Sequence, residues 1–140
     1  MKVNGIMLEP GYGFSRQLVI SESDISRFAH LFEDDNPLHH DAEFAKASRF
    51  GGLIASGPHI MSLFTAMVAT HFSKITPMVG TQFSFDFVAP VKPSETIIMA
   101  WQIESLNSRR QGLAIQLDGH VRDGDIDLIR GHGSILLLDV

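Results

Sequence analysis

The sequence from Gly57 to His71 reads GPHIMSLFTAMVATH and contains no Asp, Glu, Lys or Arg. Pro58 suits the first turn of a helix, where its missing N–H costs nothing. Apolar residues then occupy nearly every face, and a helix that is apolar all round must be enclosed by the rest of the protein. We therefore predict a buried helix from Gly57 to about His71.

The surrounding stretch from Arg49 to Lys74 has no charged residue between its ends, which raises the question of a membrane span. Its helical part is only about 15 residues long, shorter than the roughly 20 that a bilayer requires. The stretch is also interrupted by Gly51, Gly52 and several polar residues. We predict that the protein has no membrane-spanning helix.

Period-two alternation after Gly80 predicts the enclosing element. Thr81, Phe83, Phe85 and Phe87 point one way in an extended chain, and three further stretches repeat such a pattern. We expect strands at 13–20, 81–87, 97–103, 113–121 and 129–138, turns at 107–111 and 123–125, and shorter helices at 22–32 and 41–47. A curved antiparallel sheet around one buried helix, an α+β fold, is the economical packing for these elements.

Length and composition agree with one domain covering residues 1–140, large enough to fold without disulfides or structural metal. The formal charge of −5 disfavours a nucleic-acid surface, since the only adjacent basic pair, Arg109 and Arg110, falls in an expected turn. The chain has no Cys, and no targeting segment is visible near Met1. These features fit the cytoplasm, which we take as the expected location.

The stretch from Asp34 to His39, DDNPLH, places two titratable groups on a turn that Pro37 makes rigid. An acid and a base in fixed geometry are what proton transfer requires. Asp, Asn and Pro are also ordinary turn formers, so these residues alone favour a plain turn between helices.

The continuation adds Asp41, Phe44, Ala45 and the run from Phe50 to Gly57. With these residues the chain resembles the MaoC-like dehydratases, the (R)-specific enoyl-CoA hydratase family, over roughly residues 14–138. The resemblance implies the hotdog fold, a sheet wrapped around a central helix. It also implies reversible addition of water to trans-2-enoyl thioesters of coenzyme A or acyl carrier protein.

By the same resemblance Asp34 and His39 form the catalytic acid–base pair, and the backbone N–H of Gly57 meets the developing negative charge on the thioester oxygen. The other residues implied to bind substrate or brace the site are Asn36, Ser56 and Thr65. The side chains of the contiguous His39, His40 and Asp41 should diverge, and no paired ligand spacing occurs, so we expect no metal site and no cofactor.

Two positions depart from the family pattern. Glu33 stands where Gly commonly precedes the catalytic Asp, so the local turn is expected to differ, and Asp35 stays open as the partner of His39. Ser56 replaces the His that many members carry before Gly57, a change tolerable if the backbone N–H is the group required. His59 is a candidate to compensate for the missing His at position 56, although a buried His more often has a structural role.

Two other functions compete with hydration. Hotdog thioesterases commonly use an acid on or beside the central helix, yet no Asp or Glu occurs from Gly57 to Phe72. A non-catalytic acyl-thioester-binding subunit would lack Asp34 or His39, and both are present. Because a wrapped sheet leaves an exposed edge, we also expect a homodimer or a dimer of dimers. The family resemblance implies that the acyl thioester binds between the subunits.

Overall fold

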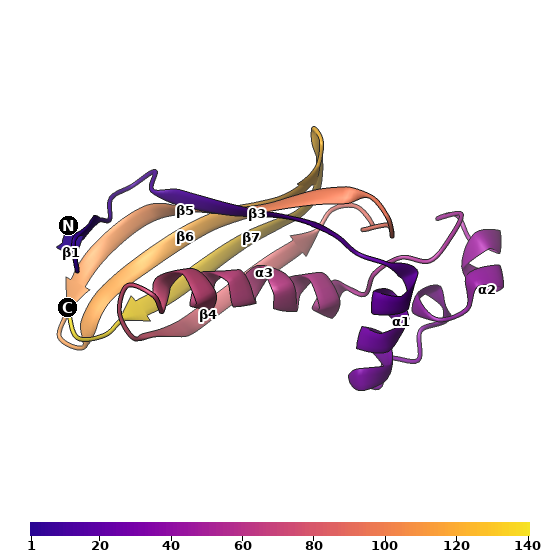
Figure 1. Ribbon diagram of the computed structural model, residues 1–140, viewed down its shortest axis with the longest axis horizontal. Coiled ribbons are helices and arrows are strands. Elements are labelled where there is room, and N and C mark those ends of the chain that lie inside the picture. The colour runs from indigo at the N-terminus through magenta and orange to yellow at the C-terminus, as the bar shows by residue number, and fades with distance from the viewer.

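The computed structural model describes all residues from 1 to 140 as a curved five-stranded antiparallel sheet around one long helix (Figure 1). The strand order is β3-β5-β6-β7-β4, and β1 and β2 form a separate two-stranded sheet. The strands are β1 (Lys2–Val3), β2 (Ile6–Met7), β3 (Gly13–Val19), β4 (Met78–Phe87), β5 (Thr96–Arg109), β6 (Gly112–Asp123) and β7 (Ile126–Leu137). The helices are α1 (Glu22–Leu31), the short 3-10 helix η1 (Pro37–His39), α2 (Ala42–Ala47) and α3 (Gly57–Phe72). The expected hotdog arrangement is confirmed.

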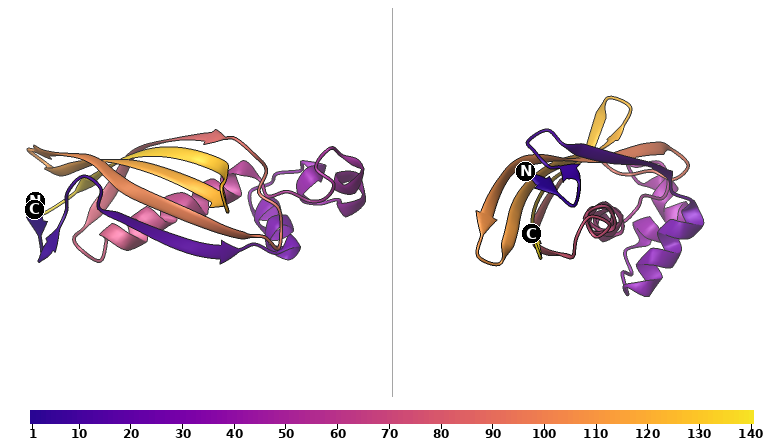
Figure 2. Two further views of the ribbon diagram at one scale, coloured as in Figure 1. Left: turned by 90° about the horizontal axis from the view of Figure 1, so that it is seen from above. Right: turned by 60° about the vertical axis from the view of Figure 1, so that its left-hand side comes forward.

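Helix α3 lies in the concave face of the sheet, as its apolar sequence predicts (Figure 2). Phe64, Val68 and Phe72 on this helix are completely buried. Trp101 of β5 stacks on Phe64 with ring centroids 4.1 Å apart, and its Nε1–H donates to the Phe64 carbonyl over 2.9 Å. The sheet therefore holds α3 by packing and by a hydrogen bond to its middle. None of the helices is both long enough and apolar enough to cross a membrane.

The shorter helices extend beyond one end of the sheet, where α1, η1 and α2 follow one another (Figures 1 and 2). The Ser21 Oγ accepts a hydrogen bond from Asp24 N–H, and the Asp24 carboxylate accepts one from Ser21 N–H, so α1 begins with the expected capping box. Asp41 caps α2 by accepting from the N–H of Phe44. These caps stabilise the starts of α1 and α2, the two helices between which Asp34 and His39 lie.

The hairpin between β5 and β6 is longer than the sequence suggests. The expected turn at 107–111 is only two residues long, Arg110 and Gln111, because Asn107 and Ser108 pair with Ala114 and Leu113. Polar residues resemble a turn in the sequence, but here Asn107 and Ser108 are exposed residues of a paired strand. Strands β4 and β7 likewise begin three residues earlier than expected, at Met78 and Ile126.

His71 of α3 packs against Phe14 of β3, and we expect this contact to make the stability of the fold sensitive to acid. Its ring stacks on Phe14 at 3.9 Å, its Nε2 lies 2.9 Å from the Tyr12 hydroxyl, and burial lowers its pKa. Because the unfolded chain takes up this proton first, the stability contribution is complete above about pH 6.5 and is lost as the pH falls towards the lowered pKa. We expect Tm to fall below pH 6.5, and to fall less steeply in His71→Gln. Thermal unfolding at several pH values measures both slopes, and equal slopes would contradict this role.

Candidate active site

The segment that contains Asp34 and His39 begins where α1 ends. The Asp34 N–H donates to the Ala29 carbonyl over 2.9 Å, and Glu33 takes the left-handed conformation with φ of 57°. Glu33 therefore adopts the backbone conformation that a glycine would adopt at this position. The expectation that the turn differs because Glu33 replaces glycine is wrong. The left-handed conformation costs a residue with a side chain about 1 kcal/mol.

Hydrogen bonds within the turn fix the direction of the Asp34 carboxylate. Its Oδ1 accepts from the Asn36 N–H over 3.0 Å, and Asn36 Oδ1 in turn accepts from the Leu38 N–H over 3.1 Å. Pro37 follows at the first position of η1, where its fixed φ suits the helix start. Asn36 thus braces the turn, and its side chain also lies on the wall of the neighbouring cleft.

His39 is 5% exposed and is held in one orientation. Its Nδ1 lies 2.7 Å from the Ile54 carbonyl, which can only accept, so Nδ1 carries the proton. The other nitrogen, Nε2, lies 3.6 Å from Asp34 Oδ2, with one third of the Asp34 side chain exposed. This separation exceeds a hydrogen bond, and it lets both groups contact the same water molecule or substrate atom.

The structure separates the two candidate acids. Asp35 is exposed and makes no hydrogen bond or ion pair with its side chain, whereas Asp34 faces His39. No group of His, Asp and Glu side chains is arranged to hold a metal ion. Of the two acids, only Asp34 faces His39.

A cleft of about 520 Å³ lies beside this pair and contains His39 and Gly57 in its wall. The Gly57 N–H, at the start of the 16-residue helix α3, donates to no acceptor in the protein. A Cβ on Gly57 would come within 3.1 Å of the Phe87 ring, so the absence of a side chain has a packing reason as well. A free N–H at a helix N-terminus can meet negative charge that develops on a bound carbonyl oxygen.

The remaining predicted residues are placed differently. Ser56 is buried, and its Oγ caps α3 by accepting from the His59 N–H over 3.2 Å, although it also borders the cleft. Thr65 lies two turns further along α3 and is half-buried outside the cleft. The structure therefore brings Asn36, His39, Ser56 and Gly57 to one cleft. Asp34 does not line this cleft but faces His39, and Thr65 lies apart.

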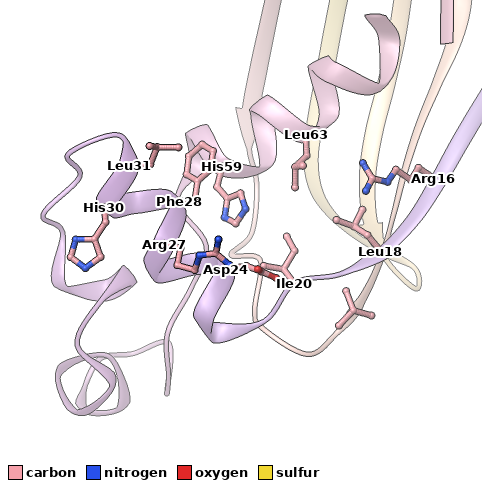
Figure 3. Close-up of a pocket in the computed structure, with 11 residues that line it drawn as sticks. Arg16, Leu18, Ile20, Asp24, Arg27, Phe28, His30, Leu31, His59 and Leu63 are labelled. Atoms are coloured by element: carbon pink, nitrogen blue, oxygen red, sulfur yellow. The ribbon is translucent and has the colours of Figure 1, made fainter. Parts of the chain in front are cut away.

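His59 does not join this group. Its ring stacks on Phe28 of α1, with centroids 4.3 Å apart, and points into a second hollow between β3, α1 and α3 (Figure 3). That hollow shares no lining residue with the catalytic cleft. Burial lowers the pKa of His59. The ring packs α1 against α3 and takes no place beside Gly57.

One residue of the segment was missed by sequence reasoning as a contributor to the site. The His40 Nε2–H donates to the Asp34 carbonyl, and His40 Nδ1 lies 3.3 Å from the Ser26 hydroxyl of α1. The sequence shows His39 and His40 side by side, but adjacent residues on a tight turn gave no reason to expect both to act on Asp34.

Comparison with known proteins matches residues 6–121 to the MaoC like domain. The chain is 28% identical to a mitochondrial 3-hydroxyacyl-acyl-carrier-protein dehydratase of Solanum lycopersicum, over 94% of this chain and 78% of that protein. It is 30% identical to the uncharacterized protein YdeM of Bacillus subtilis, over 88% of this chain and 89% of that protein. The solved (R)-hydratase of A. caviae has a similar fold, with a TM-score of 0.83 at 23% identity over 93% of this chain and 97% of that one.

Proposed function

The chain belongs to the MaoC-like domain family, and on that basis we propose that it reversibly hydrates trans-2-enoyl thioesters to (R)-3-hydroxyacyl thioesters. The observation that carries the proposal is the arrangement around His39. Its free Nε2 lies 3.6 Å from Asp34 Oδ2, on a cleft where the Gly57 N–H has no protein acceptor.

In the proposed reaction, Asp34 orients a water molecule, and the oxygen of that water attacks Cβ of the enoyl thioester. His39 Nε2 takes a proton from that water, and the imidazolium is stabilised by the nearby carboxylate. The same proton passes to Cα on the same face, which gives syn addition. The Gly57 N–H stabilises the enolate oxygen, a contribution that typically amounts to roughly 10²–10³ in rate.

The test follows the ultraviolet absorbance of a short trans-2-enoyl-CoA together with release of free thiol. Loss of absorbance without thiol supports hydration. Thiol release would instead identify a thioesterase, and no change with short, long or carrier-protein-bound enoyl substrates would favour an acyl-binding subunit.

Arg49 supports a substrate whose carrier has a phosphate group. It lies on the wall of the cleft, forms no salt bridge, and its guanidinium rests on the Phe50 ring at 4.9 Å. An oriented guanidinium suits phosphate, which both coenzyme A and the acyl-carrier-protein arm contain.

We expect Arg49→Ala to raise KM for an enoyl-CoA roughly five- to ten-fold, the effect of losing one exposed charged contact. KM for the corresponding N-acetylcysteamine thioester, which has no phosphate, should stay unchanged. Initial rates with the two substrates provide the measurement. An equal rise for both would mean that Arg49 shapes the cleft and does not bind the carrier.

We also propose a homodimer that covers strand β4. This strand is one edge of the sheet and exposes Val79 and Phe87, the latter 54% exposed on the cleft wall. Pairing of this edge with a second copy would bury both side chains and place the copy beside the substrate. Light scattering should give twice the 15.5 kDa of one chain. The mass of a single chain would contradict the homodimer and would show that no second copy covers β4 or contributes to the cleft.

A further inference from the structure

The backbone of Asp34 is held from two sides. Its N–H donates to the Ala29 carbonyl in α1, and its carbonyl accepts from His40 Nε2. The Asp34 side chain leaves this fixed peptide towards His39, so the position of the carbonyl, together with the hydrogen bond from the Asn36 N–H to Oδ1, sets where the carboxylate lies.

The direction of each hydrogen bond at His40 follows from the groups involved. A carbonyl oxygen can only accept, so Nε2 carries the proton. In the neutral ring Nδ1 then has the lone pair, and the Ser26 hydroxyl, 3.3 Å away, must donate to it. Ser26 lies on α1 and is half-buried, which connects the catalytic turn to the middle of that helix.

We propose that His40, whose tautomer is set by the Asp34 carbonyl, is a positioning residue that sets the distance between Asp34 and His39. The inference rests on the proposed hydration, since it assigns His40 a role in that reaction without contact to substrate. A displacement of about 1 Å in a catalytic group can cost roughly 10² in rate, so a missing tether should lower turnover while leaving substrate binding intact.

His40→Leu removes both hydrogen bonds and keeps an apolar side chain of similar reach. His40→Gln can restore them, because its amide N–H can donate to Asp34 and its carbonyl can accept from Ser26. His30→Leu is the matched control. The His30 ring lies next to that of His40, with centroids 4.3 Å apart and the ring planes tilted by 46°, but His30 makes no side-chain hydrogen bond.

We expect His40→Leu to lower kcat for enoyl-CoA hydration roughly 10- to 100-fold with KM within about two-fold of wild type. His40→Gln should recover most of kcat, and His30→Leu should keep it. Full turnover in His40→Leu would overturn the proposal. So would equal losses in the Leu and Gln variants that follow a common fall in Tm, since that pattern indicates a purely structural role.

A second readout does not depend on activity. Two-bond ¹H–¹⁵N correlation spectra should show His40 protonated at Nε2, and Ser26→Ala should weaken that preference. In His40→Leu the resonances of His39 should shift, whereas His30→Leu should leave them in place. If the wild type hydrates no enoyl thioester, the proposed function fails while these spectra still test the tether. The Nδ1–H tautomer at His40 would refute it in either case.

Discussion

His39→Ala and Asp34→Asn are each expected to lower kcat/KM for trans-2-enoyl-CoA hydration by about 10³-fold or more, because general acid–base catalysis typically contributes 10²–10⁴. The reason differs between the two. His39→Ala removes the free Nε2 that exchanges the proton. Asp34→Asn keeps the oxygen that accepts from the Asn36 N–H, so the turn survives while the charge facing His39 is lost.

Asp35→Asn is the matched control for this prediction. It changes the same residue type one position along the chain, at an exposed side chain that contacts neither His39 nor the cleft. We expect its rate to stay within about two-fold of wild type. A large loss in Asp35→Asn together with a small loss in Asp34→Asn would reverse the assignment that the geometry makes.

The double variant adds information about how the pair works. If Asp34 and His39 act on one water and one proton, removing the second group after the first should cost little more. Multiplicative losses would mean that the two residues serve separate steps. Absorbance assays on all four proteins give the rates needed for this comparison.

The central helix was predictable because the signal is local and repeated. The enclosure on all sides that its apolar sequence suggests is incomplete in this chain, since Ala66, Ala69 and Thr70 are exposed. Every turn from Gly57 to His71 is apolar, and alternation in β5 places Ile97, Met99 and Trp101 in the core as expected. The hairpin turn was misjudged because polarity marks solvent exposure as readily as it marks a turn. Asn107 and Ser108 are polar but lie in paired strands.

The candidate site was only partly predictable, and the missing part is tertiary. Asp34, His39 and Gly57 could be selected from their spacing and from the family resemblance. The Ser26 hydroxyl that faces His40 comes from a segment outside the family motif. The Ile54 carbonyl that fixes the His39 tautomer lies within the motif, but its contact with His39 exists only in the folded chain. The packing of Phe87 against Gly57 has the same origin, since the two residues meet only when β4 lies beside the start of α3.

The glycines of β6 and β7 show a further constraint that a sequence pattern hides. A Cβ on Gly119 would lie 2.5 Å from the Trp101 ring and 2.8 Å from Phe64, and one on Gly131 would lie 2.9 Å from Phe64. Both glycines have an ordinary strand backbone, so their conformation does not require glycine. They are needed because the aromatic rings occupy the space where a Cβ would lie. The glycines leave room on the inner face of the sheet for Trp101, which stacks on Phe64 of α3.

Gly119→Ala is therefore expected to destabilise the fold by about 2–3 kcal/mol, which corresponds to a fall in Tm of roughly 5–10 °C. The added methyl group must displace Trp101, whose Nε1–H bond to Phe64 and ring stack hold the middle of α3. Gly52→Ala is the matched control, because nothing lies within 4 Å of the position where its Cβ would be. Thermal and urea unfolding of both variants measure the difference. If Gly119→Ala unfolds no earlier than Gly52→Ala, the rings have room to shift without cost, and the position of α3 cannot depend on the contact with Trp101.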